Sequence, residues 1–317
     1  MQADLDTLAD NLLQFPNVIG EGLDLDPFMD EEIIHRVKPA GAYKDAMLRL
    51  ILREDESQRS EPLPFNVLKE KFELRKHELT VWSGYKRHGK SALISQVLVA
   101  QMKRQQRMFI ISPEFRPEAV LERMLYQFTG TQAVDAEDIK TFLAWADRFV
   151  WLYDNQASLK PRVVIALCRY GAKELKADHI LIDSLMKCGI DFDDYSGQKR
   201  FVDKVQSIAH AYPLHIHLVA HARKGKGRGD EGAPSLHDVK GGSEIADLAE
   251  NVLMVWRNTR KEKEKGKHDS EPDAQLIVEA QRNARGWIGV VSLFYDPDCM
   301  LFYEPGYAPE RADRVRF

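Results

Sequence analysis

The stretch Gly84-Tyr85-Lys86-Arg87-His88-Gly89-Lys90-Ser91 completes the phosphate-binding pattern G-x-x-x-x-G-K-[ST] in this 317-residue chain. Residues 78–82 before it are typical of a short buried strand, and residues 92–98 after it begin a helix-like apolar pattern. The pattern requires this order of strand, loop and helix. The sequence therefore predicts a nucleoside triphosphate site, with a merely flexible glycine loop as the alternative.

Each part of the loop has a predicted task. Its glycines let backbone N–H groups approach the phosphates at the start of a helix. Lys90 is predicted to reach the β- and γ-phosphates, and Ser91 to bind Mg²⁺. We expect ATP or another nucleoside triphosphate, held with Mg²⁺ by Gly84, Tyr85, Lys86, Arg87, His88, Gly89, Lys90, Ser91 and Ala92.

The composition is that of an ordinary soluble protein, with 44% hydrophobic and 30% charged residues. The sequence has no apolar run long enough to cross a bilayer, and its first residues are acidic, unlike a secretory signal. We predict a cytoplasmic protein, bacterial or in the host cytoplasm if phage-encoded. The net charge of −4 means that nucleic-acid binding would need local basic patches. Cys168, Cys188 and Cys299 lack metal-site spacing and are predicted to be reduced thiols.

Residues 1–64 differ from the rest of the chain. They are acidic and interrupted by prolines, with short helical patterns such as 43–53 and a polar stretch at 54–62 that is typical of a linker. We predict a helical N-terminal arm over residues 1–64, involved in subunit contacts.

Residues 65–317 are predicted to form an α/β domain, because strand-like and helix-like segments alternate, as in a parallel sheet with crossover helices. The last three predicted strands are closer together, which favours an antiparallel edge in a mixed sheet. The predicted strands are 79–83, 108–112, 149–153, 180–183, 216–220 and 252–256, followed by 276–280, 290–295 and 300–303.

Two carboxylates follow predicted strands. Asp183 ends an apolar strand, where such a residue binds Mg²⁺ beside the phosphate loop. Glu114 follows the strand after the phosphate-loop helix and is predicted to orient the attacking water. A helix cap or a surface charge is the alternative for Glu114, and Glu118 is the second candidate for the base.

His221 follows another apolar strand. At that position it could contact the γ-phosphate and report hydrolysis, or it could be structural. His215 and His217 share one face of the same strand and are interpreted as packed or solvated.

The order of these motifs resembles that of the DnaB-like ring helicases, most of all the Twinkle-type and phage-type primase-helicases. The matching segments are 78–84, 112–114, 182–183 and 219–224, and the resemblance covers about residues 65–305. It implies a RecA-like ATPase core. Residues 238–243 resemble the family's DNA-contacting loop, and residues 281–289 resemble the segment whose arginine, here Arg282, reaches the nucleotide of a neighbouring subunit.

The resemblance implies a homo-hexameric ring that translocates on single-stranded DNA, with a primase or a loader as a further partner. The residues expected to contact DNA are Arg223, Lys224, Lys226, Arg228, Lys240 and Gly242, in a loop that could instead be solvated. The chain departs from the family at Ala280, where a lysine is common, and at Lys240, where an arginine is usual. Arg285 could supplement Arg282. Nothing resembles a primase zinc module.

The sequence is compatible with three functions. The leading one is a replicative DNA helicase driven by nucleotide hydrolysis. The second is a RecA-like DNA-dependent ATPase that is not a helicase, such as a recombination mediator or a regulatory or defence component. The third is a weakly catalytic ring that binds nucleotide mainly for assembly.

Overall fold

A computed structural model of the chain describes residues 39–45, 47–48, 61–191, 193–223, 232–239, 243–264, 266, 268–283 and 286–307. The chain divides into two compact units, Met1–Arg59 and Ser60–Phe317. In the first unit, the described residues include a 3₁₀-helix over Ala40–Tyr43 and exposed side chains at Met47 and Leu48. The predicted arm over residues 1–64 stays a prediction.

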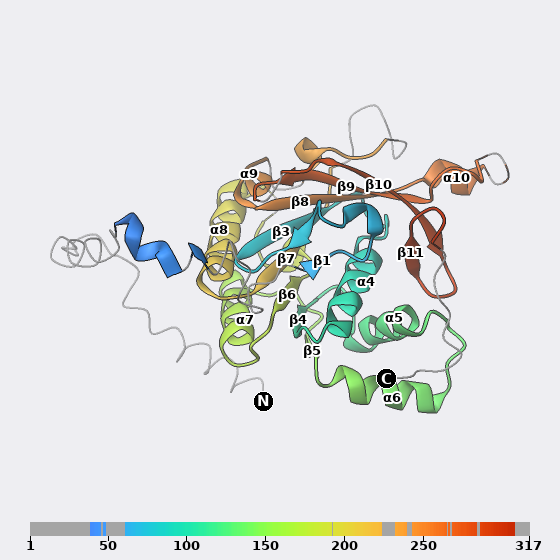
Figure 1. Cartoon of the computed structure of the whole chain (residues 1–317), viewed down its shortest axis with the longest axis horizontal. Coiled ribbons are helices and arrows are strands. Elements are labelled where there is room, and N and C mark those ends of the chain that lie inside the picture. Colours follow the sequence, from blue (N-terminus) through green and yellow to red (C-terminus); the bar gives the residue numbers. More distant parts are fainter. Residues whose placement is uncertain are drawn as a thin grey trace. The chain divides into compact units, whose positions relative to one another are not determined.

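The second unit is built on a sheet that has nine strands among the described residues. Its strand order is β11-β10-β9-β8-β3-β7-β6-β4-β5 (Figure 1). The parallel strands are β3 (Glu78–Ser83), β4 (Met108–Ile111), β5 (Val150–Tyr153), β6 (His179–Ile182), β7 (His215–Val219) and β8 (Asn251–Arg257). All six residues of β3 are buried, as expected for a parallel strand covered on both faces.

The predicted antiparallel edge is confirmed. Strand β9 (Ala274–Gln281) pairs antiparallel with β8, β10 (Gly289–Asp296) with β9, and β11 (Leu301–Tyr303) with β10. The fold is therefore a mixed, mostly parallel α/β sheet, as the sequence predicts.

Helices cover both faces of the sheet (Figure 1). One core cluster joins one face to α4 (Lys90–Lys103), α5 (Pro117–Thr129) and α6 (Ala136–Ala146), through residues such as Leu93, Met124 and Phe142. The other joins the opposite face to α7 (Pro161–Lys173), α8 (Tyr195–Ala211) and α9 (Ser243–Leu248). A short helix, α10 (Thr259–Lys263), follows β8.

The predicted linker over residues 54–62 does not extend to residue 62, because residues 61–62 form a short strand. Strand β1 (Glu61–Pro62) pairs with β2 (Glu73–Leu74), and Leu63 and Phe65 are buried in the core. The cause is local, because the apolar side chains that follow the two prolines pack into the core. A 3₁₀-helix, η3 (Asn66–Leu68), completes this segment, and Glu304 accepts the N–H groups of Asn66 and Val67 at 2.6 and 2.7 Å.

Within the described part of the chain, none of the helices has the length and apolarity needed to cross a bilayer. The three cysteines are all buried, and none forms a disulfide. Burial raises the pKa of Cys168 to about 12. The free thiols agree with the prediction of reduced cysteines, and their burial shows that they are core groups.

Candidate nucleotide site

The carboxyl ends of four parallel strands bring the predicted site residues to one edge of the sheet. The phosphate loop follows β3, and Glu114, Asp183 and His221 follow β4, β6 and β7. Because β3, β7, β6 and β4 are neighbours in the sheet, their ends face one crevice. This is the edge at which open α/β sheets bind their ligands.

The phosphate loop needs glycine at both of its ends. Gly84 has φ 144°, and a Cβ there would lie 2.2 Å from the backbone oxygen of Val255 on β8. Gly89 has φ 83° and directly precedes α4. Both positions are in the region that only glycine adopts without strain. The loop is therefore pressed against the sheet, with the start of α4 directed at the space for phosphate.

The loop's side chains divide into two kinds. Lys86 and Arg87 are exposed, whereas Tyr85 and His88 are buried and meet edge to face, with ring centroids 5.2 Å apart. His88 Nδ1 accepts the Arg257 N–H at 3.0 Å. The imidazole of His88 thus anchors the loop to the end of β8, which leaves the loop's backbone to face a ligand.

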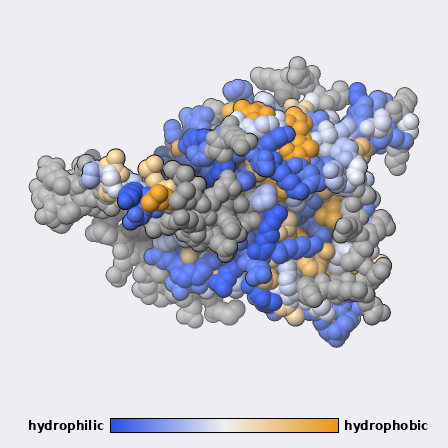
Figure 2. Space-filling view, in the orientation of Figure 1, coloured by the Kyte–Doolittle hydropathy of each residue, from blue (hydrophilic) through white to orange (hydrophobic). Residues whose placement is uncertain are grey.

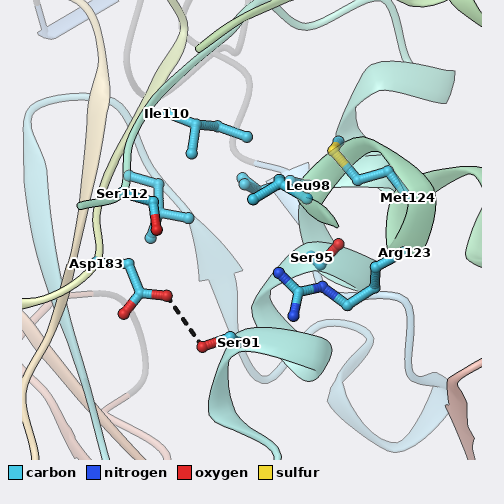
Figure 3. A pocket seen from close by; sticks show the side chains of 10 residues that line it. Ser91, Ser95, Leu98, Ile110, Ser112, Arg123, Met124 and Asp183 are labelled. Atoms are coloured by element: carbon cyan, nitrogen blue, oxygen red, sulfur yellow. Dashed lines mark hydrogen bonds between the residues drawn. The ribbon is translucent and has the colours of Figure 1, made fainter. Parts of the chain in front are cut away.

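Lys90 and Ser91 lie at the first turn of α4, inside the crevice. The Lys90 ammonium donates to the backbone oxygens of Gly84 and Tyr85 at 2.9 and 2.7 Å. Ser91 Oγ donates to Asp183 Oδ2 at 3.0 Å (Figure 3). A serine hydroxyl beside a carboxylate is a donor set that suits Mg²⁺, a cation that takes only one or two protein ligands beside phosphates and water. The residues present therefore fit a nucleotide with its magnesium ion.

Burial raises the pKa of Asp183 to about 6, and the charge of Glu114 adds to the increase. Ser91, Arg123 and Lys90 act in the opposite direction. A carboxylate in such a setting gains from a nearby cation. This charge balance agrees with the donor set in favouring a divalent ion at Asp183.

Glu114 is held by two side chains. Ser184 Oγ donates to Glu114 Oε1, and His221 Nε2 lies 3.5 Å from the same oxygen. The hydrogen bond from His221 is the largest cause that lowers the pKa of Glu114 to about 2. The glutamate is therefore an ionised carboxylate at any physiological pH. The second candidate, Glu118, lies in the first turn of α5 with a largely exposed side chain near Arg116.

Arg123 is a part of the crevice that sequence reasoning missed. It projects from α5 into a small cavity between α4 and the ends of β4 and β6, which is also lined by Ser91, Ser95, Ser112 and Asp183 (Figure 3). Its Nε and the hydroxyls of Ser95 and Ser112 are buried without a hydrogen-bond partner. No motif marks an arginine in the middle of a helix, so only the three-dimensional arrangement reveals it.

Arg282 lies at the opposite edge of the sheet from the phosphate loop. It follows the end of β9, and Gln281 pairs with Asn251 at the start of β8. The loop's Gly84 lies against Val255, four residues further along β8, which is about 13 Å of strand. The guanidinium donates to the backbone oxygen of Asp247. Arg282 is thus directed away from the nucleotide site of its own chain.

Of the predicted DNA-contacting loop, the structure describes residues 222–223 and 232–239. Ala222 and Val239 form an antiparallel bridge, which brings these two segments together. Arg223 donates to the hydroxyl of Tyr195 at 2.9 Å, and its guanidinium lies 5.4 Å from the centroid of that ring. The other predicted positions, Lys224, Lys226, Arg228, Lys240 and Gly242, and also Arg285, lie outside the described residues.

The parallel core, the glycine loop after its first strand and the carboxylates at the neighbouring strand ends define a RecA-like fold with a phosphate-loop nucleotide site. The sequence profile of the DnaB-like helicase C-terminal domain matches residues 65–304. The chain belongs to this family. It is therefore an ATP-dependent DNA helicase of the replicative kind, and it hydrolyses nucleoside triphosphates.

Solved structures share the fold. A DnaB-like replicative helicase, described with its interactions with primase, has a TM-score of 0.68 at 13% identity over 95% of this chain and 75% of its own. A separately solved ATPase domain has 0.63 at 14% identity over 90% of this chain and 99% of its own. The KaiC-like protein PH0186 from Pyrococcus horikoshii OT3 has a TM-score of 0.56 at 13% identity. This match covers 77% of the present chain and 99% of PH0186. The comparison with curated proteins gives no match.

Proposed function

We propose that the chain works as a homo-hexameric ring that translocates on single-stranded DNA and unwinds the duplex ahead of it. Hydrolysis of ATP or another nucleoside triphosphate, with Mg²⁺, would drive the movement. The observation that carries this proposal is the position of Arg282, at the opposite edge of the sheet from the phosphate loop. A site that needs this arginine requires a second copy of the chain.

In this proposal the phosphate loop binds the nucleotide, Asp183 helps to hold the metal ion, and Glu114 activates water. Backbone N–H groups of residues 84–91 and the Lys90 ammonium bind the phosphates, and Ser91 and Asp183 hold the metal ion. Mg²⁺, when bound, neutralises charge on the β- and γ-phosphates. Glu114 accepts the proton of the attacking water, and the contact between His221 and Glu114 supports a role for His221 in reporting the state of the site.

Arg282 would complete the neighbour's site by stabilising charge on the transferred phosphoryl group, which can be worth several orders of magnitude in rate. The surface around it suits a protein contact, because Ile288 and Val290, in and after the same connection between β9 and β10, are 65% and 49% exposed. Figure 2 shows hydrophobic residues gathered over the β9–β10 side of the sheet. A contiguous patch of exposed apolar groups is typical of an interaction site.

The DNA contact would lie at the same carboxyl edge as the nucleotide crevice. Arg223 is exposed there and stacks on Tyr195, a pair that offers both charge and an aromatic ring to a nucleic-acid strand. The basic residues of 224–242 would extend this surface. A primase is a further proposed partner, by analogy with the related helicase whose structure is described with primase. A loader and the subunit contacts of the N-terminal arm also remain proposals.

Lys90→Ala tests this function directly. We expect the variant to fold normally and to lose both nucleotide turnover and strand separation on a forked duplex, because no other loop side chain reaches the phosphates in the same way. Lys140→Ala is the matched control, since Lys140 is exposed on α6 and pairs with the exposed Glu137 at 3.7 Å. Wild-type turnover in well-folded Lys90→Ala protein would overturn the proposal.

A further inference from the structure

Glu250 is a buried carboxylate directly before β8, only 4% exposed. Its Oε2 accepts the Leu79 N–H at 2.8 Å. Its Oε1 accepts Gln206 Nε2 at 2.7 Å and lies 3.1 Å from His210 Nε2. These partners come from β3 and α8, so Glu250 joins three elements at the amino edge of the sheet.

Arg282 contacts both the side chain and the backbone of this glutamate. Its NH1 lies 3.7 Å from Glu250 Oε1, and its own N–H donates to the Glu250 backbone oxygen at 2.7 Å. The guanidinium also donates to the Asp247 backbone oxygen. Even so, the Arg282 side chain is 54% exposed. The arginine is thus fixed on one side and open to solvent on the other.

Glu78, the first residue of β3, makes an equivalent contact to Asn283, the residue that follows Arg282. Its Oε1 accepts Asn283 Nδ2 at 2.8 Å and lies 3.8 Å from Arg75 NH1. Its Oε2 accepts Asn251 Nδ2 at 2.9 Å. Glu78 is 3% exposed. Two adjacent residues after β9 are therefore each tied to a buried carboxylate.

Burying a carboxylate is costly unless donors surround it. Glu250 and Glu78 already have hydrogen-bond donors from the sheet and from α8. Each nevertheless directs one oxygen at an exposed side chain of residues 282–283. A long arginine loses considerable rotamer freedom when it is held in one orientation. Fixing it in advance spares that entropy when the neighbouring subunit arrives.

We propose that Glu250 and Glu78 are positioning residues, which hold Arg282 and Asn283 in the orientation that serves the nucleotide site of the neighbouring subunit. This inference rests on the proposed action of Arg282 in trans. It goes beyond that action, because two residues that lie away from the nucleotide crevice would then control how fast the neighbour's site turns over.

Subunit mixing separates this role from a general structural one. Equal mixtures of Lys90→Ala and Arg282→Ala chains form contacts that have an intact phosphate loop and an intact arginine. Recovered hydrolysis in this reference mixture is the test of action in trans. Glu250→Gln is then added to one chain or the other. The amide oxygen can still accept the Leu79 N–H, but the negative charge that faces Arg282 is lost.

Glu250→Gln in the Lys90→Ala chain, which donates the arginine, should lower the recovered kcat by about tenfold or more, since small misplacements of a catalytic group are costly. The KM for nucleotide should change less than about twofold, because ground-state binding uses the other chain's loop. Glu250→Gln in the Arg282→Ala chain should leave the recovery as in the reference mixture. Glu271→Gln is the control, since Glu271 binds Arg260 at 3.0 Å at the far end of the β8–β9 hairpin.

Equal loss in both arrangements, or no loss in either, would overturn the positioning role. Failure of the reference mixture itself, in rings shown to exchange subunits, would instead overturn the proposed action in trans. If Glu250→Gln chains do not fold, Asn283→Ala replaces them, because Asn283 is exposed and its loss leaves Glu78 with Asn251 and Arg75. The same asymmetry between the two arrangements is expected.

Discussion

His221 Nε2 lies 3.5 Å from Glu114 Oε1 and links the end of β7 to the carboxylate that follows β4. Arg223, a proposed DNA contact, is only two residues after His221. A change at the DNA surface therefore has a short route to the group proposed to activate water. The contact offers a physical route by which bound DNA would stimulate hydrolysis.

Glu114→Gln should keep nucleotide binding and lose hydrolysis. The amide preserves the shape of the side chain but cannot take a proton from water, and a general base typically contributes 10²–10⁴-fold, so we expect a fall of about a hundredfold or more in kcat. Nucleotide affinity measured by a fluorescent analogue should stay within a few fold. Glu118→Gln is the matched control and should keep its hydrolysis. If Glu118→Gln lost hydrolysis while Glu114→Gln stayed fully active, the base would be Glu118 and not Glu114.

Arg223→Ala should weaken binding of single-stranded DNA similarly for all sequences, because the guanidinium is proposed to contact phosphate. Loss of one phosphate contact lowers the slope of log affinity against log salt by roughly 0.7 for single strands. A salt series of binding isotherms measures this slope, with Lys140→Ala as the exposed-charge control. An unchanged slope and affinity would remove Arg223 from the DNA surface.

The three histidines His179, His215 and His217 predict how stability depends on pH. They are buried together on β6 and β7, where Trp82 Nε1 donates to His217 Nδ1 and His179 Nδ1 lies 3.1 Å from His217 Nε2. Burial lowers the pKa of His215 to about 4 and those of the other two well below their usual value.

A histidine with a lowered pKa in the fold stabilises it fully above the unfolded pKa of about 6.5, and this stability is lost as pH falls below that value. Urea unfolding between pH 7.5 and 5 should therefore show falling stability, with each histidine contributing up to about 1.4 kcal/mol per pH unit. His217→Gln should reduce this slope. A wild-type free energy of unfolding that is flat over this range would contradict the burial of neutral imidazoles.

The sequence predicts the crevice better than its surroundings. The phosphate loop, Asp183 and Glu114 follow apolar strands, and parallel strands bring their carboxyl ends to one edge, so their proximity could be predicted. Arg123 could not, because its role depends on the rotation of α5 over the sheet. The side chain of His88 anchors the loop to β8, although the pattern leaves its position unspecified. The contact between Arg282 and Glu250 depends on strand register, which the motifs do not encode.

Each nucleotide site is proposed to need a second copy of the chain, which supplies Arg282. Turnover per chain, measured over a wide dilution series at saturating nucleotide and Mg²⁺, tests this requirement most directly. The rate per chain should fall steeply on dilution, as complexes of six 36.4 kDa chains dissociate. A constant rate per chain, down to concentrations at which only monomers remain, would contradict it.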